Sequence, residues 1–318
     1  MSNAIIRQTG AGSVVADNIW QFRLGAGSFA LGLLAGAAAT ALIRAAAVRR
    51  ARPRPPTPSG WPVGFAHRGG ADVVPENTLE GFHEGMRMLG GDGVVELDVH
   101  ATADGVVVVL HDPDVSRTTD GSGPVAEKTL AEVQALDAGY QHTTDGGLTF
   151  PWRDRGVRVP TLAAVYEEFP DRPVNIELKG TRPGIEQLLV DVVVAAGAES
   201  RTLVVADRRA PLQRFRRASA GTVATGASTG EFVLFWLLTL ARLGDLYQPP
   251  FQALQPPEHV KGVRVVSPHL VREAHRRGLR VDVWTIDTEP AMRRLLAMGV
   301  DGIMTDRPDI LGRVLGAG

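Results

Sequence analysis

From about Trp61 onward, short aliphatic runs alternate with longer stretches in which apolar residues recur at helical spacing. The aliphatic runs predict strands at 63–67, 93–99, 106–110, 173–178, 202–206, 222–225, 251–255, 263–266, 280–285 and 302–304. The amphipathic stretches predict helices at 78–89, 161–169, 184–196, 208–218, 231–243, 268–277 and 289–298. This repeated alternation favours an α/β fold, a TIM-type (β/α)8 barrel, over an open doubly wound sheet. No GxGxxG follows a predicted strand, which weakens a dinucleotide-binding interpretation.

One connection breaks the alternation. Only ATADG separates the strands at 93–99 and 106–110, and a parallel crossover needs about a dozen residues. We therefore expect an antiparallel hairpin with its turn at Asp104–Gly105. A turn centred there places Asp98 opposite His111, with β carbons about 5 Å apart. The stretch 113–160 shows only one short helical pattern, near 129–136, and predicts a small insertion at the barrel mouth.

The first 60 residues differ from the barrel at 61–318. Residues 24–42 carry no charge, and a helix of that length spans a hydrocarbon core of about 30 Å. An arginine cluster and the linker PRPPTPSG follow. This pattern predicts an N-terminal hydrophobic helix that acts as a single-pass membrane anchor, in preference to a cleaved signal peptide or a disordered extension. The arginines on its C-terminal side predict a cytoplasmic catalytic domain.

Composition narrows the function classes. A net charge of −1 gives no basic field for a nucleic-acid partner. The absence of cysteine excludes disulfides, thiolate catalysis and zinc–cysteine sites.

Carboxylates are paired in two of the predicted strands. Glu96 and Asp98 are two residues apart, so both side chains point to one face of the strand, and Glu177 and Lys179 repeat this spacing. Such positions can face solvent, but the valine, leucine and isoleucine around them predict buried strands. Buried acids directed together repel unless a cation lies between them. Three carboxylates from two strands suit Mg²⁺ or Ca²⁺.

Two histidines end predicted strands. His67 follows VGFA and His111 follows VVVVL, and the C-terminal ends of barrel strands carry active sites. A lone histidine there is more often structural. Two of them, with Arg68 beside one and acids near the other, indicate a general acid–base pair. Arg68 offers a planar, permanently charged fork for phosphate oxygens.

The motifs HRGG, PENT, ELDV, DG, HDP, RTT, IELK, VWT and DGIMTDRP occur in this order between His67 and Pro308. Each is weak alone, but the ordered set resembles the glycerophosphodiester phosphodiesterase family. The resemblance implies metal-dependent hydrolysis of glycerophosphodiesters to glycerol 3-phosphate and an alcohol, with the neighbouring glycerol hydroxyl as nucleophile.

The resemblance also implies roles for individual residues. It implies acid–base catalysis by His67 and His111, metal ligation by Glu96, Asp98 and Glu177, phosphate contacts from Arg68 and Lys179, positions near the pocket for Glu76 and Asn77, and an aromatic substrate contact from Trp284. Which histidine is the acid stays open. Asp306, in TDRP, is expected to cap the last helix.

The predicted helix at 231–243 has almost no polar face. Either the loop that follows covers it, or it contacts a bilayer surface. Members of the family with a hydrophobic stretch here include enzymes of the lysophospholipase D type. The alternative function is therefore a lysophospholipase D that acts on membrane lysophospholipids. An inactive membrane-tethered binding module is a third possibility, against which the intact histidines and acids argue.

Overall fold

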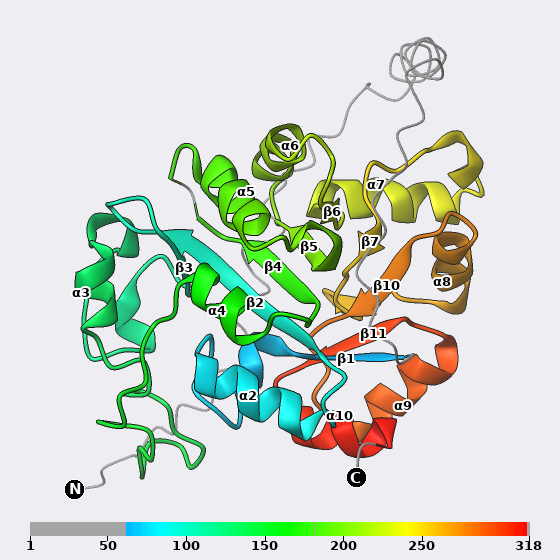
Figure 1. Ribbon diagram of the computed structural model, residues 1–318. Helices are drawn as coiled ribbons and strands as arrows, with labels where there is room; N and C mark the ends of the chain where they lie inside the picture. Colours follow the sequence, from blue (N-terminus) through cyan, green and yellow to red (C-terminus); the bar gives the residue numbers. More distant parts are fainter. Residues whose placement is uncertain (1–61, 181, 317–318) are drawn as a thin grey trace, which may run out of the picture. The chain divides into compact units, whose positions relative to one another are not determined.

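The computed structural model describes residues 62–180 and 182–316, in which eight parallel strands form a nearly closed barrel with helices around it (Figure 1). Around the barrel the strands follow the order β6 (Ala224–Thr225), β5 (Thr202–Val205), β4 (Val174–Leu178), β2 (Val94–Ala101), β1 (Val63–Ala66), β11 (Gly302–Thr305), β10 (Arg280–Val283) and β7 (Ala253–Leu254). A single parallel bridge between Gly226 and Ala253 joins the two end strands. The predicted TIM-type barrel is confirmed.

Helices follow most strands and cover the outside of the barrel (Figure 1). They are α2 (Leu79–Met88), α4 (Leu162–Glu168), α5 (Ile185–Ala195), α6 (Arg209–Ala218), α7 (Thr229–Leu240), α8 (Pro268–His275), α9 (Glu289–Met298) and α10 (Pro308–Leu315). All the predicted helices are present. At the start of α2 the Thr78 hydroxyl accepts a hydrogen bond from the Gly81 N–H at 3.0 Å, as its sequence position suggests.

One predicted strand is wrong. The 263–266 run does not join the barrel, because β8 (His259–Val260) and β9 (Val263–Arg264) form a separate antiparallel pair. Lys261 and Gly262 between them both have positive φ, 48° and 79°, as a two-residue hairpin turn requires. Because this tight turn joins two short valine-containing runs, the two runs pair with each other and not with the barrel strands.

The predicted hairpin is present, but its register differs by one residue. β2 pairs with β3 (Val107–Val109) so that Val99 lies opposite Val109, and the Leu110 N–H donates to the Asp98 carbonyl at 3.0 Å. Asp98 is thus opposite Leu110, and its expected pairing with His111 is wrong. The cause is a three-residue loop, closed by Thr102 and Val106, with Gly105 at φ 86°. A two-residue turn would have moved the register by one.

The insertion at 113–160 lies between β3 and α4 and contains α3 (Leu130–Gln134), η3 (Val115–Arg117) and η4 (Val125–Glu127). Its apolar side chains form a cluster separate from the main core, with Val108 and Leu110 contributed by the hairpin. The main core packs the barrel strands against the surrounding helices. The insertion is therefore an ordered unit with packing of its own.

The predicted hydrophobic helix at 24–42 lies outside the described residues. Within the described ranges, no helix combines the length and the apolar character needed to cross a bilayer.

Candidate active site

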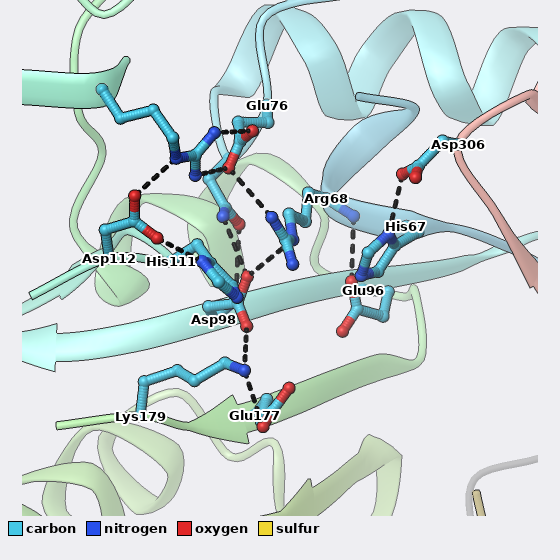
Figure 2. A network of polar contacts seen from close by, with 12 residues as sticks. His67, Arg68, Glu76, Glu96, Asp98, His111, Asp112, Glu177, Lys179 and Asp306 are labelled. Carbon is cyan, nitrogen blue, oxygen red and sulfur yellow. Dashed lines mark hydrogen bonds and ion pairs between the residues drawn. The ribbon is translucent and has the colours of Figure 1, made fainter. Parts of the chain in front are cut away.

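Except for Trp284, the predicted site residues gather at the C-terminal ends of the strands (Figure 2). His67 follows β1, and His111 follows β3. Glu96 and Asp98 lie in β2, next to Glu177 of β4, and the register pairs Asp98 directly with Glu177. The parallel barrel thus joins residues that are far apart in sequence.

His67 lies in η2 (His67–Gly69), the tight turn after β1. Its Nδ1 is 2.7 Å from Asp306 Oδ1. Asp306 follows β11, and its own N–H donates to the Asp287 carboxylate at 2.8 Å. Burial disfavours the imidazolium, but the charge of Glu96 and the Asp306 hydrogen bond raise the pKa of His67 to about 9. The expectation that Asp306 caps the last helix is wrong, because its carboxylate is directed to the histidine.

His111 has a carboxylate in the same position. Its Nδ1 lies 2.5 Å from Asp112 Oδ1, and its carbonyl oxygen is 3.0 Å from His100 Nε2. Hydrogen bonds from His111 and Arg117 hold the pKa of Asp112 well below its usual range. A carboxylate on Nδ1 orients the ring and leaves Nε2 directed away from the partner.

An ion-pair network connects the insertion to the first barrel loop. Arg117, in η3, makes two hydrogen bonds of 2.7 Å to the Glu76 carboxylate and one to Asp112. Glu76 also lies 3.3 Å from Arg68 Nη1. Burial opposes ionisation of Glu76, but Arg117 and Arg68 lower its pKa. Although RTT and HDP mark both positions in the sequence, the roles of Asp112 and Arg117 were not predicted, because nothing in the local pattern shows that they meet.

Asp98 lies at the centre of the site (Figure 2). The Asn77 side chain donates to it at 3.1 Å, Arg68 Nε lies 3.2 Å away, and Lys179 Nζ lies 3.8 Å away. Burial opposes its charge, but Arg68, His111 and Lys179 lower the pKa of Asp98. Asn77 and Arg68 have φ of 57° and 54°, a strained backbone that is typical of functional sites.

The three predicted metal ligands are all carboxylates, of which Glu96 and Asp98 are buried and Glu177 is partly exposed. Arg68 N–H donates to Glu96 at 2.9 Å, and Lys179 lies 2.8 Å from Glu177. Burial raises the pKa of Glu96 and of Glu177 to about 7. In the described part of the chain, no three acidic or histidine side chains converge as a ready ligand group. The donor chemistry nevertheless fits a hard divalent cation, since carboxylate oxygens from the adjacent strands β2 and β4 lie at the same end of the barrel.

Trp284 lies apart from this network. It follows β10 and packs against the cluster that contains Val63, Phe65 and Met304. Its indole N–H donates to the carbonyl of Gln255. The Gln255 side chain in turn donates to Asn175 at 2.8 Å. The structure therefore places Trp284 in packing, and its predicted contact with substrate stays a prediction.

Known proteins resemble the whole barrel. Residues 67–310 match the glycerophosphoryl diester phosphodiesterase family. A glycerophosphodiester phosphodiesterase of Caldanaerobacter subterraneus subsp. tengcongensis is 34% identical over 252 residues, which cover 78% of this chain and 95% of the relative.

Solved structures share the fold. The glycerophosphoryl diester phosphodiesterase domain of an uncharacterized protein from Mycobacterium tuberculosis has a TM-score of 0.68 at 22% identity, covering 79% of this chain and 98% of that domain. An Oleispira antarctica phosphodiesterase, solved in complex with its product sn-glycerol-3-phosphate, has a TM-score of 0.60 at 25% identity, covering 81% and 96%. The chain therefore belongs to the glycerophosphoryl diester phosphodiesterase family and is a phosphoric diester hydrolase.

Proposed function

We propose that the chain hydrolyses glycerophosphodiesters to glycerol 3-phosphate and an alcohol, with His67 and His111 as the acid–base pair. The observation that carries the proposal is the matched pair of histidines, each with a carboxylate on Nδ1, on either side of Arg68 and Asp98 (Figure 2). A carboxylate partner fixes the tautomer and orientation of a catalytic imidazole. The product bound to the Oleispira antarctica relative agrees with this reaction.

We assign proton donation to His67. The charge of Glu96 and the Asp306 hydrogen bond raise the pKa of His67, which favours the protonated ring that can donate to the departing alcohol oxygen. His111 accepts the proton of the glycerol hydroxyl that attacks phosphorus. The attack forms a cyclic phosphodiester as the alcohol leaves, and water then opens the ring to glycerol 3-phosphate.

Arg68 and Lys179 are the proposed phosphate contacts. Arg68 Nε lies 3.2 Å from Asp98 and Nη1 lies 3.3 Å from Glu76, and these contacts hold the guanidinium as a planar, charged group for phosphate oxygens. Glu76 and Asn77 hold Arg68 and Asp98 in place, and we propose that they act by positioning. Trp284 remains the proposed aromatic contact to the substrate.

Glu96, Asp98 and Glu177 would hold a divalent ion, Mg²⁺ or Ca²⁺, which would neutralise phosphate charge as the bond breaks. Treatment with EDTA is expected to abolish turnover, and added Mg²⁺ or Ca²⁺ is expected to restore it. Turnover is measured by release of glycerol 3-phosphate. Activity that survives exhaustive chelation would remove the metal from the proposal.

The substrate is tested by product analysis. Glycerophosphocholine and lysophosphatidylcholine are supplied in parallel with Mg²⁺ or Ca²⁺, and glycerol 3-phosphate from the first is the expected product. Lysophosphatidic acid formed only from the second would instead establish the lysophospholipase D alternative. No product from either substrate would favour an inactive binding module.

The histidine assignment is tested by substitution. His67→Ala and His111→Ala are each expected to lower kcat by about 10²–10⁴-fold, the usual contribution of a positioned acid or base. His83→Ala is the matched control, because His83 is an exposed residue of α2 that pairs with Glu168. The assignment fails if either site variant turns over as fast as the control.

A further inference from the structure

A row of exposed leucines runs along the outer face of α7 and continues into the turn η6 (Gly244–Leu246) that follows it. Leu234, Leu237, Leu240, Leu243 and Leu246 recur at every third position and are 45%, 51%, 57%, 44% and 77% exposed. They make up most of the large hydrophobic side chains that are exposed in the described ranges. We call these five residues the leucine ridge. Contiguous exposed apolar side chains of this kind mark interaction surfaces.

The opposite face of α7 holds the helix to the barrel. Phe235 is fully buried and packs edge-to-face on Phe251, with ring centroids 6.4 Å apart. Glu231 is also buried and accepts hydrogen bonds from Arg216 of α6 at 2.6 and 3.1 Å. The helix is therefore secured by its inner face. The loop that follows does not cover the ridge, since Leu246 at its start is the most exposed member.

Exposed arginines flank the ridge. α6 and α8 lie on either side of α7 (Figure 1), and the exposed arginines of this region include Arg208, Arg209, Arg217, Arg242, Arg272 and Arg276. α6 contains no acidic residue. The nearby acids Asp245 and Glu273 already pair with Arg276 and Arg277. The surface is thus apolar along its centre and positive along its edges.

We propose that the leucine ridge docks on the surface of an anionic lipid bilayer. Leucines that enter the acyl boundary, with arginines at headgroup level, are the arrangement by which interfacial helices bind such membranes. A second copy of the chain fits less well, because in a two-fold contact the arginines beside one ridge would face those beside the other.

The position of the ridge relates docking to the site. α7 starts after β6, at the strand ends that carry the active site, and ends before β7 at the opposite end of the barrel. Leu240, Leu243 and Leu246 therefore lie near the end of the barrel at which β1 begins. Docking through the ridge holds the barrel against lipid and leaves the mouth uncovered. The proposal is independent of the reaction.

The absence of cysteine makes a direct test simple. Leu240→Cys in the full chain is labelled with a nitroxide and mixed with vesicles of phosphatidylcholine and phosphatidylglycerol. Leu148→Cys is the matched control, because Leu148 is an exposed leucine of the insertion, 84% exposed. On vesicles, we expect the nitroxide at 240 to become accessible to molecular oxygen and protected from a water-soluble paramagnetic relaxation agent. The nitroxide at 148 should stay accessible to the water-soluble agent. Vesicles of phosphatidylcholine alone should give a smaller effect.

Three results would overturn the proposal. First, the label at 240 could stay as accessible to water as the label at 148 on vesicle-bound protein. Second, the protein could fail to bind the vesicles. Third, the label at 240 could become protected without lipid as the protein concentration rises. The last result would identify a second copy as the occupant. A Leu237→Glu/Leu240→Glu double variant should lower the protection seen for a label at Leu243→Cys about tenfold. Its turnover of water-soluble glycerophosphocholine should equal that of the wild-type chain, which confirms that it folds.

Discussion

At the scale of single residues, the two histidines are supported in different ways. Asp306 is held from the barrel side, through the Asp287 carboxylate that accepts from its backbone N–H. Asp112 is held from the insertion side, through Arg117. The orientation of His67 thus depends on barrel residues alone, whereas that of His111 depends on contacts that cross into the insertion.

Asp306→Asn tests whether this support matters. The amide keeps the shape but removes the charge that raises the pKa of His67, so we expect kcat to fall by roughly 10²–10⁴-fold. The limb of the pH profile that reports His67 should also move to lower pH, because a cause of the raised pKa is lost. Both are measured from kcat and kcat/KM against pH.

Asp309→Asn is the control, since this nearby acid of α10 pairs with Arg307. If Asp306→Asn and Asp309→Asn have the same kcat and the same pH profile, Asp306 has no role in positioning His67.

The sequence predicts the positions of the candidate catalytic groups better than those of their partners. His67, Glu96 and Asp98 follow from strand ends and alternation, which are local rules. The Asp306 contact joins residues 239 positions apart, and only barrel closure brings them together. A local rule assigned Asp306 to a helix end, and the distant contact decided its actual orientation.

At the scale of elements, α2 packs tightly on the turn that carries His67. A β carbon added at Gly85 would overlap the Gly69 carbonyl oxygen and lie 2.7 Å from the Ala66 β carbon. Gly85→Ala is therefore expected to lower the free energy of unfolding by about 1–3 kcal/mol, despite the better helix propensity of alanine. Urea denaturation measures the change.

Gly230→Ala is the matched control, because Gly230 also lies in a helix but has open space where its β carbon would be. Its free energy of unfolding should stay unchanged or rise by up to about 1 kcal/mol. Equal changes in the two variants would show that the contact between α2 and the turn is not tight.

The elements themselves could be predicted because their periodicity is strong, and the helices were found within a few residues of their observed ends. Register could not. The Asp104–Gly105 pair indicates a turn, but the choice between two and three loop residues depends on hydrogen bonds between Thr102 and Val106. That choice moved the partner of Asp98 by one residue.

At the scale of the whole molecule, the N-terminal segment predicts membrane attachment. We expect the full chain to remain with membranes after a high-salt wash, because nineteen uncharged residues would span the bilayer. A chain that lacks residues 1–60 should be released by salt, since the leucine ridge and its arginines bind only at the surface. Both are measured by sedimentation.

Turnover of glycerophosphocholine by the shortened chain serves as the folding control and should equal that of the full chain. A full chain that is wholly soluble would dismiss the anchor.

The separate packing of the insertion has an evolutionary consequence. Its apolar cluster shares no buried side chain with the main core, and effects of distant substitutions usually add without coupling. Mutations can therefore accumulate in one unit without repacking the other. Arg117 and Asp112 limit this freedom, because they tie the insertion to His111 and Glu76. Elsewhere in the insertion, a substitution in this apolar cluster is therefore expected to leave the packing of the main core unchanged.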